Sequence, residues 1–385
     1  MNRIITLALL FCCAFYAKGQ IEHGPYLQNV GEDQATIVWH TKINSIGWVE
    51  IAPDDGTNFY YTERPKRFDS SLGVKNISKI HAVTLDDLKP GTTYRYRIYS
   101  QEVKGDNFIQ PDFGRISASD VYYQKPPSFT TNDSKKPETS FLMVSDIHGR
   151  KDVLKTLLEI ADYKSRDAII YNGDMVNHFA SQESVFEGFM TTSIELFAKE
   201  KPMYYARGNH ETRGGLAPKF HEYFNNGEPY LYYSFRQGPI CFVVLDTGED
   251  KPDSDIEYFG LGDFDSYRDK QVKWLAETLE SEAYHTAKFK VIIGHIPPAP
   301  NKDIWHGAQE IFEKFVPLLN KANADIMLSG HLHKYLNVSD ADQINFPVII
   351  NSNNTVIKGD TKGNELLLQV FDLKGKVIDK ITIKH

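Results

Sequence analysis

The sequence predicts an all-β domain followed by an α/β domain. In the first third of the 385 residues, short runs of aromatic and β-branched residues alternate with turn residues, as in an antiparallel sandwich. After about residue 138, apolar runs alternate with segments in which apolar residues recur every three or four positions. Strands that alternate with helices are typical of a sheet covered by helices. We therefore expect a β-sandwich over residues 20–131 and an α/β domain over residues 138–385.

The first 19 residues have the composition of a secretory signal peptide. Arg3 precedes an apolar run over residues 4–17, and small residues follow, with a cleavage point near Gly19 and Gln20. An uncleaved anchor is the alternative, but this run is shorter than the roughly 20 residues that span a bilayer. We expect a secreted or periplasmic protein without a membrane span.

The predicted sandwich contains five β-type runs with turn residues between them. These runs cover residues 35–41, 47–52, 59–63, 79–85 and 93–100. The stretch LDDLKPGTTYRYRIYS places Tyr94 shortly after Leu88 and Pro90, which is the pattern of a tyrosine corner. Together with Trp39, this pattern resembles a fibronectin type III domain. The polar, turn-rich residues 130–140 are the expected domain boundary.

Charge and cysteine content restrict the possible partners. The formal net charge is −8, and removal of Arg3 and Lys18 with the signal would leave −10, so the chain has no basic footprint for nucleic acid. Two of the three cysteines lie in the signal, and Cys241 lies in an apolar run. We therefore interpret Cys241 as a core residue rather than half of a disulfide. The oligomeric state is not visible in the sequence.

The second domain places its most unusual polar residues directly after strands. Predicted helices cover residues 151–165, 182–200, 269–283 and 308–322. Five predicted strands end in polar residues, namely Asp146 and His148, Asp174, Asn209 with His210 and Glu211, His295, and His331 with His333. In open α/β sheets, ligands bind at the carboxyl ends of the strands. We expect these side chains to meet at one edge of the sheet.

The residue types at this edge are those of a metal site. Three carboxylate or amide oxygens and four imidazoles, without a thiolate, suit two cations such as Fe, Mn, Zn or Ni. Glycine precedes several of these residues and lets the chain turn sharply toward a cation. An isolated Asp-x-His or His-x-His is more often a turn or a solvated loop, but five such motifs at successive strand ends favour a shared metal centre.

The order of the motifs, D-x-H, GD, GNHE, GH and GH-x-H, resembles the calcineurin-like metallophosphoesterase superfamily. With the β-rich domain in front, the chain resembles the secreted, purple-acid-phosphatase-related branch of that superfamily. The resemblance implies a catalytic domain of two sheets flanked by helices and a cofactor of two metal ions, divalent or Fe(III) with a divalent partner. It also implies a ligand set, in which Asp146, His148 and His333 hold one metal, Asn209, His295 and His331 hold the other, and Asp174 bridges both.

The resemblance also implies roles for two further residues. His210 corresponds to the residue that contacts the phosphate or protonates the leaving group, with support from a carboxylate such as Glu211. Asn177 stands where purple acid phosphatases have a tyrosine that binds ferric iron and gives the colour, so we expect a colourless site with Asn177 facing the phosphate. Arg150 and Arg207 are more simply interpreted as structural ion pairs.

The implied function is hydrolysis of small phosphate monoesters by metal-activated water that attacks phosphorus. Phosphodiesters, including cyclic nucleotides, are the alternative substrates. A different class of function also stays open, in which the front domain makes the chain a non-catalytic binding or adhesion protein. The acidic segment 248–266 lacks the ordered spacing of a calcium loop, and we interpret it as a surface loop.

Overall fold

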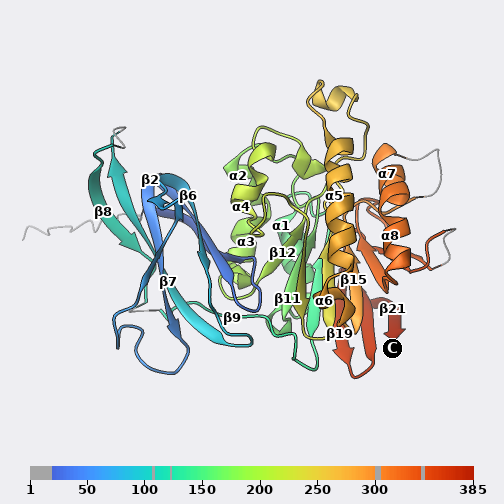
Figure 1. Cartoon of the computed structure of the whole chain (residues 1–385), viewed down its shortest axis with the longest axis horizontal. Helices are drawn as coiled ribbons and strands as arrows, with labels where there is room; N and C mark the ends of the chain where they lie inside the picture. Colours follow the sequence, from blue (N-terminus) through green and yellow to red (C-terminus); the bar gives the residue numbers. More distant parts are fainter. Residues whose placement is uncertain (1–19, 106–108, 122–123, 300–304, 340–342) are drawn as a thin grey trace, which may run out of the picture.

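A computed structural model describes residues 20–385 except 106–108, 122–123, 300–304 and 340–342. The predicted signal peptide therefore lies outside the described residues. Figure 1 shows a β-rich domain beside a larger α/β domain. No helix among the described residues is long and apolar enough to cross a membrane.

The front domain is built around one long strand. Its strands are β1 (Ile21–Gln28), β2 (Ala35–Pro53), β3 (Lys66–Phe68), β4 (Ser70–Ser71), β5 (Val74–Lys75), β6 (Ser78–Leu85), β7 (Thr93–Lys104), β8 (Asp112–Ala118) and β9 (Ser128–Thr130). The first part of β2 pairs with β1 and β6, and its second part pairs with β3 and β7. Because the register shifts between His40 and Ser45, β2 passes from one layer to the other. The run 59–63 forms turns instead of the predicted strand.

Two predicted features of this domain are present. The backbone N–H of Lys89 donates to the Tyr94 hydroxyl over 3.0 Å, which is the expected tyrosine corner. Trp39 is fully buried between the two layers, and its indole N–H donates to Ser100 over 2.8 Å. The two layers therefore share a packed core, as the sandwich prediction requires.

The α/β domain has two mixed sheets of six strands. The first has the order β12-β11-β10-β19-β20-β21, with β10 (Ser140–Val144), β11 (Ala168–Asn172), β12 (Met203–Ala206), β19 (Thr355–Lys362), β20 (Glu365–Asp372) and β21 (Val377–Lys384). The second has the order β13-β14-β15-β16-β18-β17, with β13 (Tyr233–Gln237), β14 (Ile240–Val244), β15 (Phe289–Ile293), β16 (Ile326–Ser329), β17 (Leu336–Val338) and β18 (Val348–Ile350). Strands β10 to β12 are parallel, as are β14 to β16.

Helices cover the outer faces of both sheets, and the inner faces pack against each other through residues such as Phe141 and Phe242. Over the first sheet lie α1 (Lys151–Ile160), α4 (Phe220–Tyr223) and the helical segment of α2 (Gln182–Val185), η2 (Phe186–Met190), α3 (Thr191–Ser193) and η3 (Ile194–Ala198). Over the second lie α5 (Phe264–Leu279), α6 (Glu282–His285), α7 (His306–Lys314) and α8 (Val316–Lys321). The predicted two-sheet α/β architecture is confirmed.

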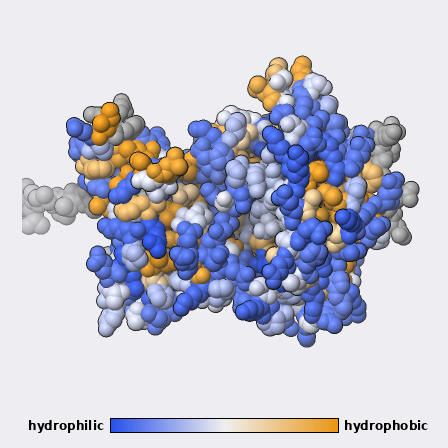
Figure 2. Space-filling view, viewed as in Figure 1, coloured by the Kyte–Doolittle hydropathy of each residue, from blue (hydrophilic) through white to orange (hydrophobic). Residues whose placement is uncertain are grey.

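Short 3-10 helices occur in the loops, namely η1 (Tyr163–Ser165), η4 (His210–Thr212), η5 (Ala217–Lys219) and η6 (Ile256–Tyr258). Figure 2 shows an apolar patch at the tip above α5, where Ile256, Phe259 and Leu261 are strongly exposed.

Cys241 is free and buried on β14, as expected for a core residue.

The front domain packs on the helices over the first sheet. The hydroxyl of Tyr26 donates to the carbonyl of Tyr223 over 3.0 Å and lies 3.1 Å from Nε2 of His40. Nδ1 of His40 lies 3.3 Å from the Gln182 side-chain oxygen. His40 is thus a buried polar residue that both domains contact.

Candidate metal centre

The predicted ligands meet where the carboxyl ends of the parallel strands of both sheets come together. Asp146 and His148 follow β10, Asp174 follows β11 and Asn209 follows β12, all from the first sheet. His295 follows β15, and His331 and His333 follow β16, from the second sheet. Because the strands of each group are parallel, their ends lie at one edge, as predicted.

A first cluster contains Asp146, His148, Asp174 and His333. One donor atom from each of these residues lies within 4.8 Å of the others. Nε2 of His148 faces Nε2 of His333 at 3.0 Å, and Nε2 of His333 lies 3.5 Å from Oδ1 of Asp146. Two imidazole nitrogens and two carboxylates that converge in this way can bind one cation.

A second cluster contains Asp174, His295 and His331, again within 4.8 Å of one another. Nε2 of His295 lies 3.1 Å from Oδ2 of Asp174, and Nδ1 of His331 lies 3.1 Å from Oδ1 of Asn209. The second cluster therefore includes Asn209 as a fourth donor. Asp174 belongs to both clusters.

Five of the seven candidate ligands have a strained backbone. Left-handed φ angles between 51° and 72° occur at Asp146, His148, Asp174, His331 and His333. Residues other than glycine adopt this backbone conformation at a cost of about 1–3 kcal/mol, and such residues concentrate at functional sites. Seven other described residues, such as Leu72 and Phe259, also adopt this region, so the feature of the site is its concentration at five of the seven candidate ligands.

Two glycines allow the ligand loops to approach closely. A Cβ atom on Gly173 would lie 2.4 Å from Nδ1 of His295, and one on Gly208 would lie 2.3 Å from Oδ1 of Asp174. Gly173 also has a φ of 76°. The prediction that glycine brings the ligands together is confirmed at these two positions.

Burial controls the protonation of the candidate ligands. Burial lowers the pKa of His148 to about 4 and the pKa of His331 to about 3, so both imidazoles are neutral at neutral pH. Burial alone would also lower the pKa of His295, but the nearby Asp174 and Asp146 carboxylates raise that pKa to about 10. In the metal-free chain, the His295 proton therefore offsets one of the two buried carboxylate charges, and burial raises the pKa of the other carboxyl, Asp146.

The donor set fits two metal ions. Nδ1 of His295 donates to the carbonyl of Asn172 over 2.7 Å, which leaves Nε2 to face Asp174. That buried Nε2 atom lies 3.1 Å from Oδ2 of Asp174, but the contact lacks hydrogen-bond geometry. A cation at this position would displace the proton and provide Nε2 with a partner. Oxygen and imidazole donors without a thiolate suit Fe, Mn or Zn.

His210 lies at the mouth of the site, next to the ligand Asn209. Its backbone N–H donates to Oδ1 of Asp174 over 3.0 Å, and its Nδ1 donates to the backbone carbonyl of Asn177 over 2.8 Å. Nε2 of His210 therefore faces the clusters, 3.9 Å from Oδ2 of Asp174. With 27% of its side chain exposed, His210 is accessible to a substrate.

Asn177 contacts two histidines. Its side-chain oxygen lies 2.9 Å from Nδ1 of His148, and its backbone carbonyl accepts from His210. A proton on Nδ1 of His148 leaves Nε2 free for a cation. Asn177 therefore orients His148 and His210, a role that its predicted position near the phosphate did not include.

Glu211 does not support His210. Its buried carboxylate accepts backbone N–H groups of Asp174 at 2.8 Å, Met175 at 2.7 Å and Gly208 at 2.9 Å, and the Tyr205 hydroxyl at 2.9 Å. Glu211 thus joins two ligand loops, and the suggestion of a Glu211–His210 pair is wrong.

Of the two arginines, Arg207 makes the expected ion pair, and Arg150 is held by hydrogen bonds instead. Arg207 forms a buried ion pair with Asp246 at 2.8 Å. Arg150 donates to the backbone carbonyls of Ile147 and Asp146 at 2.9 and 3.0 Å. Neither guanidinium group is free to bind a phosphate.

The sequence reasoning missed two acidic residues beside the second cluster. Glu249 and Asp250 have exposures of 0% and 3%, although they begin the segment that we predicted to be a surface loop. Oδ2 of Asp250 lies 3.6 Å from Nε2 of His331. Both residues follow β14, so their position after a buried strand was the available signal. The outer part of the segment, near η6, is exposed as predicted.

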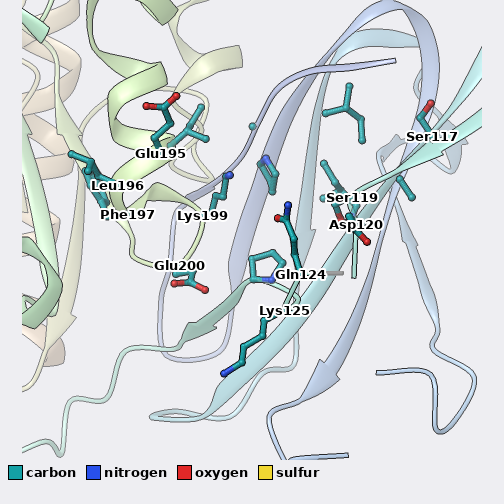
Figure 3. A pocket seen from close by; sticks show the side chains of 17 residues that line it. Ser117, Ser119, Asp120, Gln124, Lys125, Glu195, Leu196, Phe197, Lys199 and Glu200 are labelled. Carbon is teal, nitrogen blue, oxygen red and sulfur yellow. The ribbon is translucent and has the colours of Figure 1, made fainter. Parts of the chain in front are cut away.

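A separate cavity of about 400 Å³ lies between the two domains (Figure 3). Its labelled lining residues include Ser117, Lys125, Glu195 and Lys199, from the front domain and from the helices over the first sheet. None of its lining residues is a predicted ligand.

Comparisons with known proteins agree with this architecture. Residues 139–335 match the calcineurin-like phosphoesterase family, and residues 23–139 match the N-terminal domain of purple acid phosphatase. Purple acid phosphatase 21 of Arabidopsis thaliana is 24% identical over 298 residues, which are 71% of this chain and 59% of that protein. Probable purple acid phosphatase 20 of the same plant is 24% identical over 351 residues, 85% of this chain and 72% of that protein.

A solved structure supports the fold. The purple acid phosphatase PPD1 from yellow lupin (Lupinus luteus) seeds superposes with a TM-score of 0.64 at 15% identity, covering 94% of this chain and 74% of that one. The chain belongs to the calcineurin-like phosphoesterase family and has the N-terminal domain of purple acid phosphatases in front of the family's domain.

Proposed function

We propose that this protein is a phosphoesterase that uses two metal ions to hydrolyse phosphate monoesters. The observation that carries the proposal is the position of Asp174, whose carboxylate belongs to both ligand clusters. A shared carboxylate is the feature that joins two cations in one catalytic unit.

The ligands divide between the two ions. Asp146, His148 and His333 would hold one ion, Asn209, His295 and His331 would hold the other, and Asp174 would hold both. When bound, two such ions would supply Lewis acidity, which lowers the pKa of a coordinated water molecule and stabilises negative charge on the phosphoryl oxygens. Fe, Mn and Zn fit the donors, and Asn177 in place of tyrosine argues against an iron–tyrosinate.

His210 has the geometry of a proton donor to the leaving group. The Asn177 carbonyl holds the proton on Nδ1, so a second proton on Nε2 faces the clusters. Nε2 can donate this proton to an ester oxygen, or in the neutral state it can accept a hydrogen bond from a substrate. The side-chain nitrogen of Asn177 can in addition donate to a phosphoryl oxygen while its oxygen orients His148.

Two substrates distinguish the leading proposal from its alternative. Residues 20–385, loaded with manganese or with iron and zinc, are assayed on p-nitrophenyl phosphate and on bis-p-nitrophenyl phosphate. We expect faster turnover of the monoester. Faster turnover of the diester would favour a phosphodiesterase, and a cyclic nucleotide would then be tested. Two bound metals without turnover of either ester would favour a binding or adhesion protein.

We also propose that the protein is exported through its first 19 residues. Secretion of the mature chain with Gln20 at or near its N-terminus would support this, and N-terminal sequencing of protein from the medium or periplasm tests it. Retention of residues 1–19 on a membrane-bound protein would contradict it.

A further inference from the structure

The loop over residues 247–250, which follows β14, is held rigidly against the second cluster. Arg268 of α5 is fully buried, and it donates to the backbone carbonyls of Thr247, over 3.2 Å, and Glu249. The backbone N–H of Gly307 donates to the carbonyl of Asp250 over 2.8 Å. A Cβ atom on Gly307 would lie only 2.4 Å from the Glu249 carbonyl oxygen, so α7 begins in direct contact with this loop. The backbone from which the two carboxylates extend is therefore fixed in position.

These carboxylates share Arg213 as a partner, and Asp250 has His331 as a second one. Glu249 pairs with Arg213 through two contacts, at 3.0 Å to Nε and 2.8 Å to Nη2. Oδ1 of Asp250 is 3.5 Å from the same Nη2 atom, whereas Oδ2 is 3.6 Å from Nε2 of His331. Glu249 thus accepts from two nitrogens of the Arg213 guanidinium group, and Oδ2 of Asp250 remains to face the imidazole of His331.

The other nitrogen of His331 faces the candidate metal position. Nδ1 lies 3.1 Å from Oδ1 of Asn209, the oxygen that would bind the same ion. Nδ1 can bind a cation only without a proton, so the neutral ring must then have its proton on Nε2. A carboxylate beside Nε2 favours that tautomer.

We propose that Asp250 is a positioning residue of the metal centre, which accepts the Nε2 proton of His331 and so holds the ring in the tautomer that binds the second ion. A side-chain rotation that moves Oδ2 of Asp250 by about 0.7 Å would shorten its 3.6 Å distance from Nε2 of His331 to the usual hydrogen-bond length of roughly 2.9 Å. Histidine ligands in metal sites usually donate their second N–H to a carboxylate or carbonyl in this way. His295 and His148 already do so, to Asn172 and to Asn177. The inference rests on the two-metal site of the proposed function.

Replacement of Asp250 by asparagine tests the proposal because it preserves the shape of the side chain. An amide can turn its NH₂ group toward Nε2 and favour the opposite tautomer, with the proton on Nδ1. In a serine protease triad, an aspartate likewise accepts a hydrogen bond from the catalytic histidine. Its replacement by asparagine leaves the geometry intact and stabilises the wrong histidine tautomer. We expect D250N to bind the second equivalent of zinc about 10–100-fold more weakly, with the first equivalent unchanged.

The affinities are measured by competition with a chelator, without any substrate. Glu257→Gln is the matched control, since it removes one acidic group from the same acidic segment, residues 248–266, where Glu257 pairs with Lys251 at 3.0 Å. We expect the control to keep both affinities. D250N with wild-type affinity for both equivalents would overturn the proposal, and so would equal losses in D250N and E257Q.

A measurement on the wild-type chain covers the case in which D250N does not fold. Long-range ¹H–¹⁵N spectra of ¹⁵N-histidine-labelled, zinc-loaded protein report which ring nitrogen of His331 carries the proton. We expect a proton on Nε2 that is shifted downfield by a hydrogen bond. A proton on Nδ1, or zinc bound through Nε2, would contradict the proposal.

The readouts also separate this inference from the proposed function. A wild-type chain that binds two zinc ions but hydrolyses no phosphoester would contradict the enzyme, and the Asp250 proposal would still stand or fall on metal affinity. A wild-type chain that binds fewer than two ions would overturn both.

Discussion

Nε2 of His295 faces Oδ2 of Asp174 at 3.1 Å, and the two side chains are only 0% and 1% exposed. Burial of an imidazole against a carboxylate costs free energy unless the two groups form an ion pair or both bind a cation. This contact joins the two sheets of the α/β domain, since Asp174 follows β11 and His295 follows β15.

His210→Ala should retain both metals and lose turnover. The imidazole belongs to neither ligand cluster, but its Nε2 faces them. A positioned proton donor contributes about 10²–10⁴-fold in rate, so we expect a loss in that range for the monoester. His178→Ala is the control, because His178 is exposed and its ring lies 6.2 Å from that of His210. Wild-type turnover by His210→Ala would exclude the proton-donor role.

Iron-loaded protein should lack a visible tyrosinate band. Asn177, which we expect at the position of the iron-binding tyrosine, has its side-chain oxygen 2.9 Å from Nδ1 of His148. An absorption spectrum of protein reconstituted with ferric iron and zinc measures this directly. A visible charge-transfer band would mean that another tyrosine reaches the metal.

Glu211→Gln should destabilise the fold and weaken metal binding. The carboxylate accepts backbone N–H groups from both the Asp174 loop and the Gly208 loop. An amide nitrogen would face some of these donors and leave them unsatisfied, at a cost of about 2–4 kcal/mol in the free energy of unfolding. Urea unfolding measures this cost, with the exposed Glu195→Gln as control. Equal unfolding midpoints for the two variants would contradict the structural role of Glu211.

The interface between the domains should weaken in acid. Burial lowers the pKa of His40 to about 3 from an ordinary value of 6.5; the hydrogen bond to Gln182 acts in the opposite direction, and the neighbouring His23 and His81 lower the pKa further. The unfolded chain therefore binds a proton that the folded chain does not. Stability from this residue is complete above pH 6.5 and falls as the pH drops from 6.5 toward 3, by at most about 5 kcal/mol.

His40→Gln removes this dependence. The Tyr26 hydroxyl keeps its bond to the Tyr223 carbonyl, and glutamine does not titrate. We expect the unfolding midpoint in urea to fall less between pH 7 and pH 4 in His40→Gln than in the wild type. His285→Gln, at an exposed position, should behave like the wild type. Parallel pH profiles for wild type and His40→Gln would show that His40 is not the titrating group.

The strand-end motifs predicted the candidate ligands because each motif follows a parallel strand. Asp146, Asp174 and His295 come directly after apolar runs, and parallel strands bring their carboxyl ends to one edge. The two-sheet architecture followed from the same alternation and from the resemblance. Local sequence therefore contained most of the information about this site.

The environment of Glu249, Asp250 and Glu211 depends on contacts distant in sequence. Glu249 and Asp250 lie in an acidic, glycine-containing segment that resembles solvated loops, but Arg268 of α5 and Gly307 of α7 bury them. Glu211 is next to His210, yet its side chain points to the backbone of the Asp174 loop. Side-chain direction in a loop is set by such packing, which residue spacing alone does not reveal.

The most direct test of the two-metal account is the metal content and monoester turnover of Asp174→Ala. Asp269→Asn, which changes an exposed carboxylate on α5, is the control. We predict two metal ions per chain and turnover of p-nitrophenyl phosphate for the wild type and the control. For Asp174→Ala we predict at most one ion and a loss of turnover of at least about 100-fold, because Asp174 is a ligand in both clusters. Two tightly bound ions and undiminished turnover in Asp174→Ala would contradict the account.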